Sequence, residues 1–198
     1  MIRVLYLFIT VILFTSSSDV KYKEVATFST DNFVNAVIEI PGGTNHKIEY
    51  DENTNTFPCD QENGKNRIID FLAYPGNYGF IPSTLMDEEL GGDGDALDIL
   101  VLSESMSTGT ILKTIPIAIL KLKDKGALDS KIISIPADKN KQIIKATTLN
   151  ELIQGYPQVK TIIETWFLHY KGVGKMELIG WADEKAAMSE IEKYRINK

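Results

Sequence analysis

The stretch GGDGDALDILVL, residues 91–102, joins a glycine-rich acidic turn to an apolar strand. It places three aspartates, Asp93, Asp95 and Asp98, within six residues. On an extended backbone Asp93 and Asp95 would point the same way, because side chains alternate with a period of two. Carboxylates this close repel one another, so holding them beside an apolar strand calls for a compensating cation. The alternative interpretation is a solvated acidic turn.

An EF-hand calcium loop would also use these acids, since Asp93, Asp95 and Glu104 fall at positions 1, 3 and 12 of such a loop. The comparison fails inside the loop. Position 5 should be a ligand and is Leu97, and position 6 should be glycine and is Asp98. The following residues read as a strand rather than a helix, so the sequence argues against an EF-hand.

A second acidic pair lies in LKLKDKGALDSK, residues 120–131. Asp124 and Asp129 flank a turn at Gly126, as on the two arms of a hairpin, and Lys131 follows Asp129 on the same face. By itself this is an ordinary surface hairpin. Beside the first cluster it would complete a basin of five carboxylates for several Mg²⁺ ions, which take oxygen ligands.

Short strands separated by turns surround these acids and predict a small closed β-barrel. A proline within the longest strand, Pro116, marks an edge or a bulge. We expect a hairpin or loop at 51–66 and an ordered irregular loop at 73–82. The expected strands are 35–41, 47–50, 67–72, 96–102, 111–123 and, as the last clear one, 131–136.

The C-terminal third changes to a helical period. One apolar face repeats at three- and four-residue steps and runs from Val159 to Tyr170, beginning near Pro157 and ending at Gly172. A second helix is expected over 183–194, capped by Asp183. The fold class is therefore mainly β with flanking helices (α+β).

Composition excludes several functions. The 198 residues are 43% hydrophobic and 24% charged, which suits one globular domain with a substantial core. The net charge of −6 argues against wrapping nucleic acid. One cysteine, Cys59, excludes an internal disulfide and a cysteine-based zinc site, and two histidines, His46 and His169, argue against a multi-histidine transition-metal site. Any bound cation should be a hard ion.

Residues 1–18, MIRVLYLFITVILFTSSS, have the layout of a secretory signal peptide: one base, a short apolar run and a small polar cluster. We expect export to the periplasm or outside the cell, with no stable membrane span after cleavage, and a functional domain at 19–198. The alternatives are an uncleaved anchor or a misplaced start, the latter with a cytoplasmic protein.

Six blocks occur in a fixed order: VIEIPGG, KIEY, YPGNYGFIP, DGDALDILVL, LKLKDKGALDSKIISIP and HYK. In this order the chain resembles soluble family I inorganic pyrophosphatase, and D-G-D-x-x-D-x-L-V is the specific signature. The resemblance implies a five-stranded OB-type β-barrel with C-terminal helices and a homo-oligomer, either a dimer or a hexamer. It also implies Mg²⁺-dependent hydrolysis of pyrophosphate to two orthophosphates, by direct in-line attack of a metal-activated water.

The resemblance assigns roles to matching positions. Asp95 would be the general base, with Tyr78, Arg67 and Lys131 as further catalytic groups. Tyr74 matches a rim tyrosine. Mg²⁺ would be held by Asp93, Asp98, Asp124 and Asp129, with Glu39 and Glu49 acting through water. The two phosphoryl groups would be bound by Lys47, Arg67, Tyr78, Lys131, Tyr170 and Lys171.

Two places depart from the family pattern. In the first, the segment 51–66 is longer and the spacing from Arg67 to Tyr78 is shorter than the pattern, which leaves Lys65 as an alternative to Arg67. In the second, the loop after Lys171 is trimmed, which argues against a role for Lys175. Two other functions remain as alternatives: an OB barrel that binds nucleic acid, which the charge opposes, and a Ca²⁺-stabilised extracellular binding module without catalysis.

Overall fold

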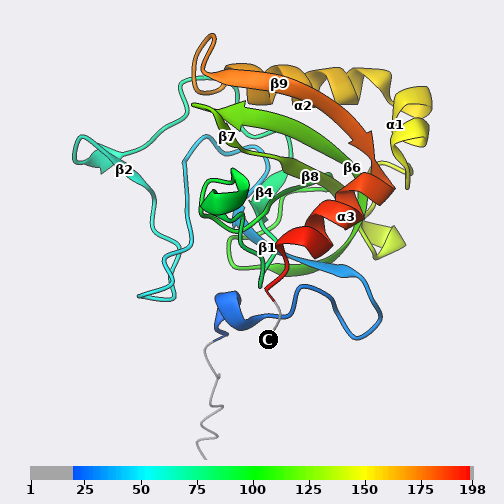
Figure 1. Cartoon of the computed structure of the whole chain (residues 1–198), viewed down its shortest axis with the longest axis horizontal. Helices are drawn as coiled ribbons and strands as arrows, with labels where there is room; N and C mark the ends of the chain where they lie inside the picture. Colours follow the sequence, from blue (N-terminus) through cyan, green and yellow to red (C-terminus); the bar gives the residue numbers. More distant parts are fainter. Residues whose placement is uncertain (1–19, 197–198) are drawn as a thin grey trace, which may run out of the picture.

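The structure, a computed structural model, describes residues 20–196 (Figure 1). The expected leader at 1–18 lies outside these residues. Five strands close into a ring in which each strand pairs with the next and the last pairs with the first. In ring order they are β1 (Val34–Ile40), β4 (Asn77–Phe80), β5 (Asp98–Val101), β8 (Lys131–Pro136) and β6 (Ile111–Asp124). The expectation of a five-stranded OB-type barrel is confirmed.

The ring is antiparallel except at one pair, β5 with β8, which runs parallel. The longest strand, β6, pairs with both β8 and β1 and so closes the ring. Its register against β8 shifts between Pro116 and Ala118, which is the bulge expected from the proline. Beyond this point β6 also pairs with β7 (Ala127–Leu128) and with β9 (Met176–Asp183).

Strand β9 was not expected, because the sequence pattern predicts no clear strand after 131–136. Most of its side chains are exposed or half-buried, and it pairs with β6 alone. The clear apolar alternation of a strand with one buried face is therefore missing, and the pattern gives little signal.

The expectation of an irregular loop over 73–82 was wrong in part, since Asn77–Phe80 forms the buried strand β4. The glycine content has a packing reason. A Cβ at Gly79 would stand 1.9 Å from the Val37 carbonyl oxygen of β1, so only glycine allows the two backbones to approach this closely.

The expected strands 47–50 and 67–72 are also wrong as regular strands. They carry only isolated bridges, between His46 and Ile68 and between Ile48 and Cys59. Between them the chain forms an exposed two-stranded hairpin, β2 (Gln61–Glu62) and β3 (Lys65–Asn66), which extends from the barrel in Figure 1.

Within residues 20–196, three α-helices cover the barrel. The two expected helices are confirmed as α2 (Pro157–His169) and α3 (Glu184–Tyr194), the latter capped by Asp183 Oδ1, which accepts from Ala186 N at 2.9 Å. Helix α1 (Leu149–Gly155) was missed, although Thr148 and Glu151 form a capping pair at its start. The short 3-10 helices are η1 (Tyr22–Glu24), η2 (Glu88–Leu90) and η3 (Lys139–Lys141).

The buried side chains form two clusters, one on each side of the barrel wall. Helices α1 and α2 pack over the cluster that includes Tyr74 and Tyr78, and α2 lies along β9 in Figure 1. Helix α3 packs on β6 and closes the other cluster with Ile191. None of the helices in the described part of the chain has the length and apolarity needed to cross a bilayer.

Candidate active site

The parallel pairing of β5 with β8 sets Asp98 directly beside Lys131. The Lys131 ammonium donates to carboxylate oxygens of both Asp98 and Asp129, and its side chain is only 2% exposed. Burial alone would lower the pKa of Lys131, but these two carboxylates hold it above its ordinary value. Asp98 and Asp129, which are 31 residues apart in the sequence, therefore share the buried Lys131 ammonium.

The second acidic pair joins this group through a second lysine. Lys171, just beyond α2, lies 2.8 Å from an Asp124 carboxylate oxygen and 3.8 Å from one of Asp129. The hairpin turn between the two aspartates is tight, because Lys125 and Gly126 both adopt positive φ angles of 50° and 93°. The expectation that these aspartates flank a turn is confirmed.

The loop that carries Asp93 and Asp95 is not extended, so the period-two argument was wrong there. Asp93 Oδ1 accepts from Asp95 N at 3.1 Å, and Gly94 has a φ of 87°, so the chain turns between them. Burial, and then the charge of nearby Asp98, raises the pKa of Asp95; burial raises that of Asp93 too, where Asp98 and Asp129 add to the effect. The turn therefore brings both acids toward the Asp98–Asp129 pair.

Glu39 and Glu49 each have a partner from the segment 47–50. Glu39, on β1, is 8% exposed and accepts from Tyr50 N at 2.7 Å. Lys47 pairs with Glu49 at 2.8 Å. Burial raises the pKa of Glu39 to about 8, against the opposing effect of Lys47 and the Tyr50 amide.

Three tyrosines line the same region. Tyr78 is 4% exposed, and the ammonium groups of Lys47 and Lys131 each lie 5.8 Å from its ring centroid. Tyr74 packs against Tyr78 with ring centroids 5.3 Å apart. Tyr170 stacks on Trp166 at 4.6 Å. Lys47 and Lys131 thus lie over the Tyr78 ring, with Asp98 and Asp129 near enough to affect its hydroxyl. Burial raises the pKa of the Tyr78 hydroxyl, which keeps it a proton donor.

Of the two alternatives for one basic position, Arg67 lies nearer the group. Arg67 pairs with Asp60 at 3.0 Å, and against the lowering effect of burial this hydrogen-bonded carboxylate raises the pKa of the Arg67 guanidinium, with a smaller contribution from the Glu49 carboxylate. Lys65 stands on the exposed hairpin strand β3. Asp60, the partner of Arg67, was missed because nothing in the sequence marks an acid seven residues before a base.

Asn77 is a second residue that the sequence did not single out. Asn77 is fully buried. Its amide oxygen accepts from Gly42 N at 3.0 Å and from Met106 N at 2.7 Å. Its amide nitrogen donates to Ser103 Oγ and to the Glu104 carbonyl. The side chain anchors the turn that leads from Glu39 toward Lys47.

The donor set suits divalent cations. The group holds seven acids and four bases, so negative charge is in excess in a partly buried region. All the acids offer oxygen ligands, which hard ions prefer. Within residues 20–196 no three acids or histidines stand close enough to form a ready-made metal cage. Lys131 is one reason, because its ammonium lies between Asp98 and Asp129. The acids are Asp93, Asp95, Asp98, Asp124, Asp129, Glu39 and Glu49, and the bases are Lys47, Arg67, Lys131 and Lys171.

Replacing Lys131 by methionine is expected to lower the free energy of unfolding by about 3–5 kcal/mol without divalent cations, because two acids lose a buried partner. Added Mg²⁺ should raise the melting temperature of Lys131→Met more than that of the wild type. Lys113→Met is the control: it removes an exposed pair with Asp31 and should cost about 1 kcal/mol or less. Equal losses, or no Mg²⁺ rescue, would contradict the prediction.

The buried Glu39 predicts a pH-dependent stability. Its pKa rises from 4.5 to about 8 on folding, so its contribution is fully present below 4.5 and is lost as pH approaches 8. In cation-free protein, urea midpoints should fall over this range, and Glu39→Gln should flatten the fall while keeping the Tyr50 hydrogen bond. Each pKa unit corresponds to about 1.4 kcal/mol. An unchanged slope in Glu39→Gln, with exposed Glu62→Gln as control, would rule this out.

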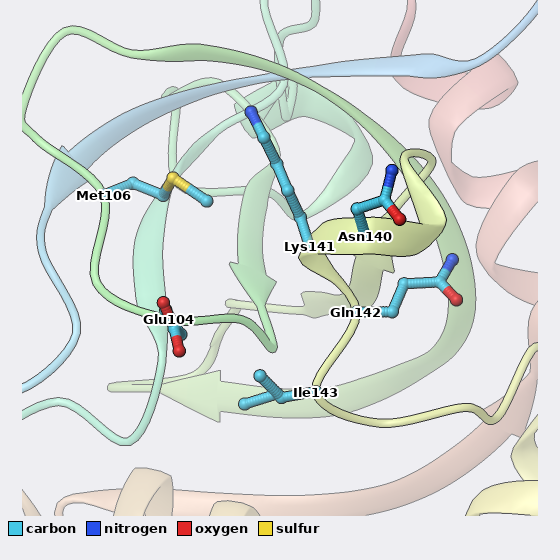
Figure 2. A pocket seen from close by; sticks show the side chains of 6 residues that line it. All are labelled: Glu104, Met106, Asn140, Lys141, Gln142 and Ile143. Carbon is cyan, nitrogen blue, oxygen red and sulfur yellow. The ribbon is translucent and has the colours of Figure 1, made fainter.

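A small pocket of about 150 Å³ lies away from this group (Figure 2). Figure 2 shows Glu104 and Met106, from the loop after β5, facing Lys141 and its neighbours. None of the predicted site residues lines it. The functional region is therefore defined by its charged side chains and not by this hollow.

Comparisons with known proteins agree with this geometry. A family model described as Inorganic pyrophosphatase matches residues 36–197. An inorganic pyrophosphatase from Neisseria meningitidis serogroup B is 37% identical over 163 residues, which cover 80% of this chain and 85% of that protein. One from Sulfolobus acidocaldarius is 35% identical over 164 residues, covering 80% and 87%.

The solved structures include an inorganic pyrophosphatase from Thermus thermophilus, which matches with a TM-score of 0.74 and 29% identity over 87% of this chain and 95% of that one. The chain belongs to the inorganic pyrophosphatase family. It is accordingly a hydrolase, an inorganic diphosphatase that converts pyrophosphate to phosphate.

Proposed function

We propose that this chain hydrolyses pyrophosphate with Mg²⁺ by direct in-line attack of water, using the acids and bases gathered around Tyr78. The observation that carries the proposal is the linkage of Asp98, Asp124 and Asp129 by Lys131 and Lys171, which ties residues from three separate stretches of the chain into one group. Acids and bases then divide the work: acids hold cations, and bases hold phosphate. This division lets an acidic protein bind an acidic substrate.

The cation ligands proposed are Asp93, Asp98, Asp124 and Asp129, with Glu39 and Glu49 acting through water. Bound there, Mg²⁺ would offset the charge of pyrophosphate and lower the pKa of the attacking water. Asp98 and Asp129 are released for this role when Lys131 turns from them toward a phosphoryl group. The ion pairs of Asp98 and Asp129 with Lys131 support this role, because they indicate that the two carboxylates require a positive charge between them.

Asp95 is proposed as the general base. It is exposed enough to meet a water, and its carboxylate makes no ion pair within residues 20–196. Burial and the neighbouring Asp98 raise its pKa, which makes it a better proton acceptor. Asp95 therefore takes the proton of the water and orients its oxygen toward phosphorus.

The phosphoryl groups are proposed to be bound by donors on the other side of the group. Arg67 offers a planar fork suited to phosphate oxygens, and Lys171 offers a mobile point charge. Tyr78 donates through its neutral hydroxyl. These donors stabilise the charge that grows on the leaving oxygen as the bridging bond breaks. The full set is Lys47, Arg67, Tyr78, Lys131, Tyr170 and Lys171.

The direct test is phosphate release from pyrophosphate in the presence of Mg²⁺. Purified chain should release two orthophosphates per pyrophosphate, and a Ca²⁺-stabilised binding module would release none. A gel-shift titration across salt tests the nucleic-acid alternative, which predicts binding that weakens as salt rises. Binding of nucleic acid without phosphate release would overturn the proposal.

We further propose that residues 19–198 form one catalytic domain, that the enzyme is a homo-oligomer, and that the leader at 1–18 directs export, with a cytoplasmic enzyme as the alternative. N-terminal sequencing of the mature protein tests the leader. An intact Met1 would contradict cleavage. Sedimentation of the purified chain tests the oligomer, and a monomer would contradict it.

A further inference from the structure

The segment before β1 reaches the loop that carries Lys47 and Glu49. Tyr22, in η1, contacts the ring of Tyr50 with centroids 5.6 Å apart and that of Phe57 at 4.8 Å, both edge-on. Its hydroxyl covers Gly109, where an added Cβ would stand 2.8 Å from it. Tyr22 lies outside residues 36–197, the part matched by the family model.

Three polar contacts strengthen the same attachment. The Tyr50 hydroxyl donates to Asn55 Oδ1 at 2.9 Å, and Asn55 Nδ2 donates to the Val20 carbonyl at 3.0 Å. Lys23 forms an ion pair with Glu52. The N-terminal segment therefore holds both ends of the turn that follows Tyr50.

Tyr50 connects this attachment to the site. Its backbone N–H donates to Glu39 Oε1 at 2.7 Å, and its ring lies against Phe80 of β4, with centroids 5.6 Å apart. Glu49, the residue before it, pairs with Lys47. Isolated bridges and single backbone hydrogen bonds, such as Lys47 N to the Arg67 carbonyl at 3.1 Å, hold this stretch in place of a regular strand ladder. The side-chain packing of Tyr50 adds to these contacts.

We propose that Tyr22 is a positioning residue for pyrophosphate hydrolysis. By holding Tyr50 against Phe80, it keeps the Tyr50 amide aimed at Glu39 and keeps the Lys47–Glu49 pair beside Tyr78. The inference rests on the proposed function, in which Lys47 binds phosphate and Glu39 acts through water. A shift of about 1 Å in such groups is enough to lower turnover substantially.

The test compares Tyr22→Ala and Tyr22→Phe with Phe28→Ala. Phe28 lies in the same N-terminal segment, but its ring packs against Arg195 and the core cluster that α3 closes. Two readouts are taken: kcat and KM with pyrophosphate at saturating Mg²⁺, and hydrogen exchange at the Tyr50 amide relative to the core amide of Leu100.

Tyr22→Ala should lower kcat about tenfold and speed relative exchange at Tyr50 by about tenfold. Tyr22→Phe should restore both to within about twofold, because the ring and its packing remain. Phe28→Ala should lose stability and leave both readouts near wild type.

The positioning role is overturned if Tyr22→Ala leaves Tyr50 exchange unchanged, or if Phe28→Ala lowers kcat equally. Failure of the wild type to release phosphate would instead refute the proposed function, while the exchange measurement would still decide whether Tyr22 holds Tyr50.

Discussion

Exhaustive removal of divalent cations is expected to reduce pyrophosphate hydrolysis to background. The group around Tyr78 has seven acids against four bases, and pyrophosphate brings more negative charge to it. Without cations the acids repel the substrate, and the several kcal/mol of charge stabilisation that a metal supplies is lost. At about 1.36 kcal/mol per tenfold, this corresponds to a rate loss of about a thousandfold or more.

The measurement is phosphate release after treatment with a chelator and desalting, followed by titration with Mg²⁺. Circular dichroism before and after chelation checks that the fold survives. Mg²⁺ should restore the rate, and Mn²⁺ and Co²⁺ compared at equal concentration would show the metal preference. Full activity after exhaustive chelation would refute the assignment of the acids as cation ligands.

Asp95→Asn is expected to lower kcat by about 10²–10⁴-fold, the range typical for loss of a general base. Asparagine has nearly the same shape but cannot accept the proton. The backbone carbonyl of Asp95, which accepts from Met86 N at 2.7 Å, is untouched, so the loop should keep its conformation. Mg²⁺ affinity, measured by calorimetry, should change little.

Asp93→Asn provides the matched comparison from the same loop. As a proposed ligand, Asp93 should affect mainly the Mg²⁺ concentration needed for half-maximal activity. If Asp95→Asn weakens Mg²⁺ binding as much as it lowers kcat, Asp95 is a cation ligand and the general base must be sought elsewhere. The pH dependence of kcat should lose its acidic limb in Asp95→Asn, since that limb reports the protonation of Asp95.

Local sequence signals predicted the structure correctly where one residue has one well-defined effect on the backbone. Pro116 marked the β6 bulge, because proline cannot donate to a central ladder. Asp183 marked the start of α3, because its carboxylate satisfies a free N–H. The pair Asp124 and Gly126 marked the turn into β7, because positive φ favours glycine.

The same signals misled wherever tertiary contacts outweighed local preference. Gly79 was one reason to predict a loop, but the close approach of β4 to the Val37 carbonyl is what requires a glycine there. Strand β9 gave little signal, because its side chains are largely exposed. The turn between Asp93 and Asp95 replaced an expected extended segment, since the Asp93 side chain accepts from the Asp95 amide.

The sequence by itself determined the kind of chemistry to expect, because an excess of carboxylates interspersed with lysines and Arg67 suits hard cations and phosphate. It also determined the two C-terminal helices, whose apolar faces repeat with the helical period. The tertiary structure alone decided which charges meet. Asp98 and Lys131 are neighbours only because β5 and β8 run parallel, and Tyr22 reaches Tyr50 only because the N-terminal segment packs across the loop after β1. Such contacts join distant parts of the chain, and no local pattern encodes them.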